Sequence, residues 1–203
     1  MLSVLFACFI LLMQIINLKE LHLKEEFILR EIRKGSILIY PTDTIYGMGC
    51  DATNEEAVKK VRKIKKRYDK PFSVIAPSKD WIRKNCVVPQ CFRSYIKKLP
   101  GAFTFILHLR NKKAVSKAIN LNLDTIGVRI PKHKFAKLIR KTKKPFLTTS
   151  VNITNKKYSI TIDGMPIALK QNCIVIDAGK LDKKPSLIID LTRKVAKISK
   201  RDN

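Results

Sequence analysis

Two basic residues at the end of one expected helix have the types and spacing that suit phosphate. Lys65 and Arg67 stand two residues apart in the segment KIKKRYDKP. A lysine supplies a point charge and an arginine supplies a planar fork of donors, so the pair could hold phosphate oxygens. The simpler interpretation is a solvated last helical turn, where basic side chains favour the helix dipole. No GxxxxGK[ST] motif is present to cradle a triphosphate instead, which favours a binding role for the pair.

A hydroxyl and an amide stand at the end of an expected strand, in the segment TTSVN. Ser150 and Asn152 have one residue between them. Side chains alternate along a strand, so both should point to the same face and could converge on one ligand. The alternative is a local turn in which these side chains bond to their own backbone. The spacing alone leaves both interpretations open.

A third candidate is the segment YPTDTIYGMGCDA, which is rich in hydroxyl groups. Gly47, Gly49 and Ala52 also match GxGxxA, the dinucleotide-binding fingerprint. In that fingerprint the first glycine follows its strand directly, whereas here PTDTIY intervenes. No ribose-binding acid is well placed in a following strand about 20 residues on. We therefore do not expect a dinucleotide site.

These segments require elements that bring them together. Gly35 should end a helix that has Leu23, Phe27, Ile28 and Ile32 on one side. Asn54 is the expected N-cap of a helix over 55–65 with Val58, Val61 and Ile64 inward, and a further helix is expected over 133–142. Strands are expected at 14–18, 36–40, 72–76, 103–109, 125–130, 145–151, 173–177 and 186–190. The sum is an α/β domain around a largely buried sheet.

Composition points to an anionic partner. The 203 residues suit one domain with a substantial core. Lys and Arg number 42 against 16 Asp and Glu, a net charge of +26 spread along the chain. Such a field attracts RNA, a nucleoside triphosphate or an acidic protein without distinguishing them, although many lysines only solvate a surface. Five cysteines with no CxxC pair, and histidines without partners at metal spacing, argue against zinc and disulfides and favour a reducing cytoplasm.

The first eighteen residues carry no charge and need separate treatment. They lack the basic region and the cleavage site of a signal peptide. Their length is at the lower edge for a membrane span, which needs about 20 residues. We favour Met13 as the true start, so that residues 1–12 are an extension of a domain over 13–203. A membrane anchor and a buried native segment stay open as alternatives.

Six segments, taken in order, resemble the motifs of the YrdC-like family, the threonylcarbamoyl-AMP synthases, in the short form without an extra C-terminal domain. YPTDTIYGMGCDA is similar to the family's opening strand and turn, and KKR at 65–67 to its KxR element. LPGAFT at 99–104 resembles the PGPxT loop, and GVRIP at 127–131 the VRxP strand. SVN at 150–152 resembles the SxN element, and KPSLIIDL the strand that contains PST. Each motif is common by chance, but six in the family's order are not.

The resemblance implies a twisted mixed sheet with flanking helices around a large positively charged cavity. It implies a nucleotidyltransferase that condenses L-threonine, bicarbonate and ATP, with Mg²⁺, into threonylcarbamoyl-AMP and pyrophosphate. A separate tRNA threonylcarbamoyl transferase would then use the product to modify an adenosine beside the anticodon. The implied location is the cytoplasm, with possible tRNA binding and no stable membrane partner.

The resemblance also assigns residues. It implies two catalytic residues that neutralise ATP phosphates, Lys65 and Arg67. It implies that ATP also contacts Thr104, Ser150, Asn152 and Lys200. It implies a threonine site made of Thr42, Thr44, Tyr46, Arg129 and Ser186. The sequence departs from the family pattern at Asn155, where glycine is usual, at Ala102, where proline is usual, and at ISKRD, where Lys200 or Arg201 replaces an arginine.

Two other hypotheses remain. A non-enzymatic RNA-binding protein could use the same basic cavity, as the charge of +26 favours. A carbamoyl-adenylating relative from hydrogenase maturation normally has zinc-finger and further catalytic domains, for which we expect no room. For the synthase, we expect Lys65→Ala and Arg67→Ala to remove most activity and to leave the fold intact, on the assumption that both side chains are exposed.

Overall fold

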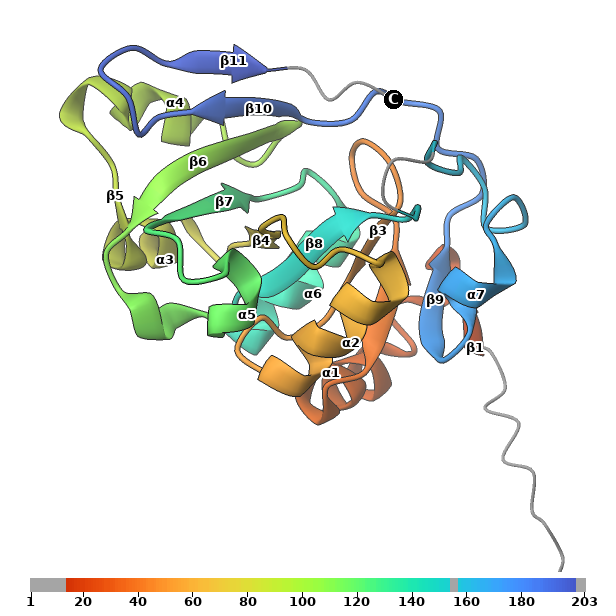
Figure 1. The fold of residues 1–203 in the computed structure, drawn as a ribbon. Helices are drawn as coiled ribbons and strands as arrows, with labels where there is room; N and C mark the ends of the chain where they lie inside the picture. The colour runs from red at the N-terminus through yellow and green to blue at the C-terminus, as the bar shows by residue number, and fades with distance from the viewer. Residues whose placement is uncertain (1–13, 154–156, 200–203) are drawn as a thin grey trace, which may run out of the picture.

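Eleven short strands pair into one twisted mixed sheet in the computed structural model, which describes residues 14–153 and 157–199 (Figure 1). The strand order is β1-β9-β2-β3-β8-β4-β7-β6-β10-β11, and β5 pairs with β6. The sheet contains both parallel pairs, such as β2 with β9 and β4 with β7, and antiparallel pairs, such as β3 with β8. The expected α/β fold class with a twisted mixed sheet and flanking helices is confirmed.

The elements have the following bounds. The strands are β1 Gln14–Asn17, β2 Ile37–Tyr40, β3 Gly47–Gly49, β4 Ser73–Ile75, β5 Cys86–Val87, β6 Phe103–Leu109, β7 Thr125–Arg129, β8 Phe146–Ser150, β9 Cys173–Asp177, β10 Leu187–Asp190 and β11 Lys197–Ser199. The α-helices are α1 Glu25–Lys34, α2 Glu55–Lys65, α3 Lys79–Asn85, α4 Arg93–Lys97, α5 Lys117–Asn120, α6 Lys134–Thr142 and α7 Ile167–Lys170. The 3₁₀ turns are η1 Leu18–Glu20, η2 Gln90–Phe92 and η3 Lys112–Ala114.

Strand β2 is covered on both faces of the sheet, which explains why it is continuously apolar. All four residues of β2 are buried. Ile37 and Ile39 pack into one core, whereas Leu38 and Tyr40 pack into a second core on the opposite face. A strand with both faces covered needs apolar residues at every position, because successive side chains point in opposite directions.

Amphipathic helices close the two cores. On one face, α1 and α6 contribute Ile28, Ile32, Phe135 and Leu138, and the ring of Phe135 stacks on Tyr40 at 4.0 Å between centroids. On the other face lies α2, with α5 beside it (Figure 1). As expected, α2 begins at a capping asparagine and α1 ends at a glycine in the left-handed region.

Most expected elements lie within two residues of their observed bounds, and several predictions were wrong in detail. Leu23 lies before α1 with 73% of its surface exposed, so it is not part of the apolar face. Ile64, expected inward, is partly buried and packs against the core. The short elements β3, β5, β11, α3, α4, α5 and α7 were not predicted. Their length explains this, because two to seven residues give too little periodicity to distinguish a helix from a strand.

The glycines of GxGxxA form strand β3 and not a phosphate-binding turn. A Cβ on Gly49 would lie 1.7 Å from the carbonyl oxygen of Leu147 on the neighbouring strand β8. A glycine is therefore required here by the close approach of two backbones. The dinucleotide fingerprint is excluded by this geometry.

The N-terminal expectations fall mostly outside the described residues, since residues 1–13 are not among them. Within the described part of the chain, no helix is long and apolar enough to cross a membrane. Strand β1 confirms the expected strand after Met13, and η1 replaces its last residue.

Candidate functional site

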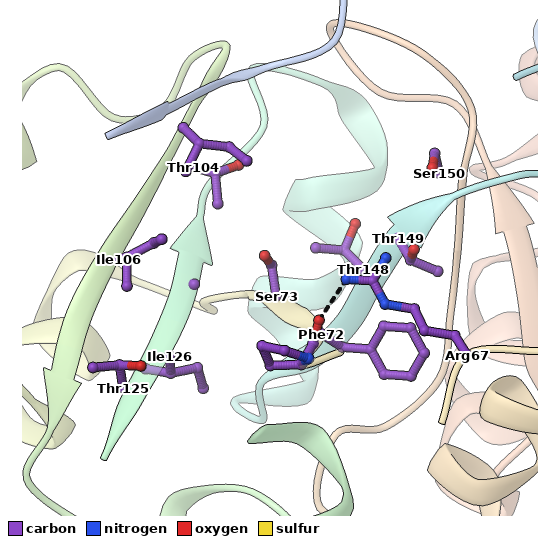
Figure 2. A pocket seen from close by; sticks show the side chains of 13 residues that line it. Arg67, Phe72, Ser73, Thr104, Ile106, Thr125, Ile126, Thr148, Thr149 and Ser150 are labelled. Carbon is purple, nitrogen blue, oxygen red and sulfur yellow. Dashed lines mark hydrogen bonds between the residues drawn. The ribbon is translucent and has the colours of Figure 1, made fainter. Parts of the chain in front are cut away.

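Two cavities meet at the C-terminal half of β8. The larger has a volume of about 370 Å³. Figure 2 shows it between β4, β6, β7 and β8, and its lining comprises Arg67, Pro71, Phe72, Ser73, Thr104, Ile106, Thr125, Ile126, Gly127, Thr148, Thr149, Ser150 and Ile188. The smaller is lined by Thr42, Thr44, Ile45, Tyr46, Gly47, Arg129, Thr148, Thr149, Ser150 and Ser186. The three consecutive β8 residues common to both linings make the two cavities neighbours.

The smaller cavity brings together all five residues expected at a threonine site. Its free volume is only about 10 Å³, about enough for one water molecule. The threonine hydroxyls satisfy each other: the Oγ1 atoms of Thr42 and Thr44 are 2.9 Å apart, and Thr42 donates to the carbonyl oxygen of Ile45 at 2.7 Å. A ligand as large as an amino acid must therefore displace side chains to enter.

Tyr46 is fixed against the end of β9. Its hydroxyl donates to the carbonyl oxygen of Gly179 at 2.7 Å and accepts from the backbone N–H of Ala178 at 2.9 Å. Burial raises the pKa of Tyr46 to about 12, so the phenol stays protonated. This side chain joins the hydroxyl-rich segment to a strand 131 residues later.

Arg129, which lines the smaller cavity, forms a buried ion pair with Asp43. The guanidinium of Arg129 donates to Asp43 Oδ1 at 2.7 Å, and Asp43 Oδ2 accepts from the backbone N–H of Lys132 at 2.9 Å. Burial lowers the pKa of Arg129, and the charge of Asp43 opposes that shift. Nε of Arg129 is buried and has no hydrogen-bond partner among the described residues. The arginine thus keeps one unused donor, while the carboxylate of Asp43 compensates its positive charge.

Lys65 is buried, contrary to the prediction of an exposed side chain. Its relative exposure is 1%, and its ammonium donates to the carbonyl oxygen of Ser150 at 2.6 Å and to Asn152 Oδ1 at 2.7 Å. It also donates to the carbonyl oxygen of Asn152. The reason is the left-handed cap at Lys66, which ends α2 and turns the chain while Lys65 still faces the sheet. The solvated-turn interpretation is therefore wrong for Lys65, and the expectation that Lys65→Ala leaves the fold intact loses the exposure on which it depended.

Arg67 is the basic residue that lines the larger cavity. Its guanidinium donates to the carbonyl oxygen of Pro71 at 2.7 Å and lies 5.3 Å from the ring centre of Phe72 (Figure 2). Burial lowers its pKa, and nearby Asp69 opposes the shift. No salt bridge to Arg67 is found within residues 14–153 and 157–199, so its charge is available to an anion in the cavity.

A second arginine, which sequence reasoning missed, positions the loop that carries Arg67. Arg62 is buried and donates to the carbonyl oxygens of Ala118 at 2.8 Å, Arg67 at 2.8 Å and Lys70 at 3.1 Å. Its guanidinium also lies 4.6 Å from the ring centre of Phe72. These bonds connect the segment 67–72 to α2, so they restrain the backbone position of Arg67.

The remaining expected residues are partly brought together. Ser150 Oγ donates to Asn152 Oδ1 at 2.7 Å, so the two side chains contact each other, although β8 ends at Ser150 and only Ser150 lines the cavities. Thr104 and Ser186 are joined at 2.8 Å between their hydroxyl oxygens, and each lines one cavity. Asn152 and Lys65 line neither cavity and instead bond to each other. Lys200 and Asn155 lie outside the described residues.

Other residues that line or support the cavities were also missed, among them Asp43, Thr148 and Thr149. Thr148 and Thr149 lie in the TTSVN segment next to a residue already singled out, and the run of hydroxyls was a signal for them. Asp43 lies inside PTDT, but its partner is 86 residues away and no local pattern connects the two.

The arrangement is suited to two anionic or zwitterionic ligands placed side by side. An arginine with buried hydroxyls can hold the carboxylate and polar groups of a small molecule, and Arg67 with the β8 hydroxyls can hold phosphate. No carboxylate is found among the lining residues of either cavity, and no group of three or more His, Cys, Asp and Glu side chains in the described segments could hold a metal ion.

Comparison with known proteins gives three findings. Residues 30–201 match the family model Sua5_yciO_yrdC, which carries the description "Telomere recombination". The "Putative threonylcarbamoyl-AMP synthase" of Methanocaldococcus jannaschii is 37% identical over 187 residues, covering 88% of this chain and 87% of that protein. The crystal structure of P. abyssi Sua5 complexed with L-threonine superposes with a TM-score of 0.78 at 27% identity. That match covers 91% of this chain but 56% of P. abyssi Sua5, so the chain spans little more than half of that relative.

Proposed function

The chain belongs to the Sua5/YciO/YrdC family, and from that premise we propose that it is an L-threonylcarbamoyladenylate synthase. The proposed reaction condenses L-threonine, bicarbonate and ATP into threonylcarbamoyl-AMP, pyrophosphate and water. One observation carries the proposal: a hydroxyl-rich cavity with a buried arginine shares the wall 148–150 with a larger cavity that Arg67 enters. The reaction needs an amino acid beside a nucleotide, and this pair of cavities supplies neighbouring places for both.

We assign threonine to the smaller cavity. Its carboxylate would bind Arg129, whose Nε has no described hydrogen-bond partner. The hydroxyl and amine of the bound threonine would form hydrogen bonds with Thr42 and Thr44, replacing the bond that now joins these two side chains. The P. abyssi relative crystallised with L-threonine supports an amino-acid site in this fold. Because the cavity has almost no free volume, binding must be accompanied by side-chain movement around Asp43 and Arg129.

We assign ATP to the larger cavity. The guanidinium of Arg67 would leave the carbonyl oxygen of Pro71 and bind phosphate oxygens, with Thr104 and Ser150 as further donors. Mg²⁺ would arrive with ATP as part of the substrate. Since the lining contains no carboxylate in the described segments, the phosphate oxygens of ATP would supply its ligands. Lys65 would act mainly by holding residues 150 and 152 in position, because its ammonium is already bonded to them.

The chemistry needs no protein nucleophile. The threonine amine attacks the carbon of bicarbonate, and loss of water leaves a carbamate. A carbamate oxygen then attacks the α-phosphorus of ATP, forming the new P–O bond as the bond to pyrophosphate breaks. Charge develops on the α-phosphate and on the leaving pyrophosphate, where positioned cationic donors such as Arg67 stabilise it. The remaining rate enhancement would come from positioning, because the two neighbouring cavities that share Thr149 would hold the substrates close to each other.

We further propose that the product serves a separate tRNA threonylcarbamoyl transferase in the cytoplasm. The relative named as a threonylcarbamoyl-AMP synthase supports this role. The four cysteines in the described part of the chain are all free, which fits a reducing compartment.

The test follows pyrophosphate release by the full chain with ATP, Mg²⁺ and bicarbonate, with and without L-threonine. We expect release that requires threonine and bicarbonate, and a product with the mass of threonylcarbamoyl-AMP. Arg67→Met should reduce the rate by about 10²-fold or more, as expected for removal of a transition-state charge donor. Arg33→Met is the matched control, because Arg33 is exposed on α1 beyond the opposite core. Threonine-independent release, or equal rates in both variants, would contradict the proposal.

A further inference from the structure

Arg62 is a buried cation whose partners are all neutral. The residue is 6% exposed, and no carboxylate forms a salt bridge with it in the described part of the chain. Its three guanidinium nitrogens donate instead to four backbone carbonyl oxygens, those of Ala118 at 2.8 Å, Arg67 at 2.8 Å, Lys70 at 3.1 Å and Ile119 at 3.3 Å. The side chain therefore connects α2, which carries it, with α5 and with the segment 67–72.

Residues 68–71 depend on two arginines for their hydrogen bonds. Within the described ranges, every hydrogen bond that their backbone accepts comes from the side chain of Arg62 or Arg67. Arg67 donates to the carbonyl oxygens of Lys70 at 3.4 Å and Pro71 at 2.7 Å (Figure 2). No backbone N–H of residues 68–71 donates to another described residue. The position of this stretch thus rests on the two guanidinium groups.

Binding of ATP would remove one of these two supports. In the proposed function, Arg67 leaves the carbonyl oxygen of Pro71 for the phosphate oxygens. Its bonds to Lys70 and Pro71 are made within its own segment, so that movement breaks them. Arg62 lines neither cavity and can keep its bonds to the carbonyl oxygens of residues 67 and 70 while Arg67 moves. A segment without Arg62 would occupy the ATP-binding conformation for only a fraction of the time.

The charges of the two arginines act in the same direction. Both guanidinium groups lie against the ring of Phe72, at 4.6 Å from its centre for Arg62 and 5.3 Å for Arg67. Burial lowers the pKa of Arg62, the charge of Arg67 lowers it further, and Asp69 opposes the shift. Like charges repel each other, and Arg62 is held by four carbonyl groups whereas Arg67 is only half-buried. Repulsion therefore favours movement of Arg67 toward an anion in the larger cavity.

We propose that Arg62 is a positioning residue for ATP, which holds the segment 67–72 in place while Arg67 turns from its own backbone to the phosphate oxygens. Arg62 acts through Arg67, because its own side chain does not line the larger cavity. The proposal gives α5 a role as well, since Ala118 and Ile119 supply two of the four carbonyl groups that hold the guanidinium. The inference rests on the proposed function, because it takes ATP as the ligand of the larger cavity.

The test measures binding of a non-hydrolysable ATP analogue and, separately, the steady-state rate of pyrophosphate release. Arg62→Met keeps the aliphatic stem and removes the guanidinium, whereas Arg62→Lys keeps the charge and replaces the planar fork by one ammonium. We expect Arg62→Met to weaken analogue binding about tenfold or more, because apparent affinity falls with the fraction of chains in the binding conformation. The kcat/KM for ATP should fall by about tenfold or more, and the KM for threonine should stay within about twofold, because threonine binds in the other cavity. Arg62→Lys should give intermediate values.

The matched control removes a different buried cation. Lys170 is 7% exposed, and its ammonium donates to the carbonyl oxygen of Ile162 at 3.1 Å. It lines neither cavity. Lys170→Met should lower the urea midpoint, as Arg62→Met should, but it should leave analogue binding unchanged. Equal analogue affinity in the two methionine variants would overturn the inference, because Arg62 would then support only the stability of the fold.

The lysine variant covers the case in which Arg62→Met does not fold. Arg62→Lys retains a buried cation, so its analogue binding can then be compared with that of the unsubstituted chain. Weaker binding by Arg62→Lys supports positioning by the planar fork. Equal binding would overturn the inference, because a charge alone would then be sufficient.

Separate measurement of binding and turnover distinguishes this inference from the proposed function. Threonine-dependent pyrophosphate release by the unsubstituted chain, together with undiminished analogue binding by Arg62→Met, would overturn the role of Arg62 alone. Analogue binding without threonine-dependent release would contradict the proposed reaction, and the comparison of affinities would still decide the role of Arg62. Failure of the unsubstituted chain to bind the analogue would overturn both.

Discussion

Replacing Lys65 by methionine tests whether a buried ammonium holds the end of β8 in place. The ammonium of Lys65 donates to three oxygens of residues 150 and 152, at 2.6 Å to the Ser150 carbonyl and at 2.7 Å to the Asn152 side chain. Methionine keeps most of the buried aliphatic stem and removes the charge. The change therefore isolates the hydrogen bonds from the packing of the side chain.

The expected loss follows from the number and setting of these bonds. A hydrogen bond to a charged group contributes about 1.5–3 kcal/mol. Ser150 and Asn152 are only half-buried beside a cavity, so water can replace part of what the ammonium supplies. We expect Lys65→Met to lower the free energy of unfolding by about 3 kcal/mol, roughly half of what three undiscounted bonds would contribute. Arg67→Met, which breaks bonds to carbonyl groups at a half-exposed site, should cost about 1 kcal/mol.

Urea unfolding monitored by tryptophan fluorescence provides the assay. Trp81 is the single tryptophan of the chain and packs against the core that contains Ile37 and Ile39. With an m-value of about 2 kcal/mol per M, the midpoint should fall by about 1.5 M in Lys65→Met and by about 0.5 M in Arg67→Met. Equal midpoints for the two variants would refute the reasoning, because Lys65 would then contribute no more to the fold than a half-exposed arginine does.

Three further predictions concern other buried or strained positions. Arg129→Met should lower the free energy of unfolding by about 3–5 kcal/mol because it leaves the Asp43 carboxylate unpaired. Adding Asp43→Asn should recover part of that loss in the same urea assay. Equal losses in the single and the double variant would contradict the ion pair. Burial lowers the pKa of His133, whose neutral Nδ1 accepts from the backbone N–H of Phe135 and caps α6. As pH falls, the unfolded chain therefore binds a proton at this histidine before the folded chain does, and stability should decrease below about pH 6.5. His133→Asn, which caps without titrating, should lose part of that dependence between pH 7.5 and 5.5, and an unchanged dependence would assign it to other groups. Gly49→Ala should lower the melting temperature sharply or prevent folding, since a Cβ would lie 1.7 Å from the Leu147 carbonyl oxygen, and an unchanged melting temperature would mean that β3 can shift freely.

The local sequence pattern was sufficient to predict those helices and strands whose periodicity and capping residues lie within the element itself. The apolar run of β6 and the bounds of α2 follow from side-chain periodicity and capping chemistry, which operate over a few residues. Asn54 accepts from the backbone N–H of Ala57, as its type and place predicted. The short strand β3 was missed because its three residues include two glycines, whose small size serves a neighbouring strand and not β3 itself.

The residues of the candidate site could be predicted only in part from the sequence. Residues such as Thr42, Ser150 and Arg129 were identified through ordered motifs, and the structure places them around two adjoining cavities. The burial of Lys65 was mispredicted because local physics treats the last turn of a helix as solvated. Its partners lie 85 and 87 residues away, and only the folded sheet brings them within hydrogen-bond distance.

The sequence by itself determined the α/β class, the family resemblance and the chemical types available for binding phosphate and carboxylate groups. These properties depend on residue identity, on periodicity within an element and on the order of motifs along the chain. Tertiary structure decided which charges meet: Asp43 with Arg129, and Lys65 with the end of β8. It also decided that Arg62 is buried among the carbonyl oxygens of α5 and the segment 67–72. Electrostatic energy depends on distance and burial, and neither quantity exists until the strands are paired.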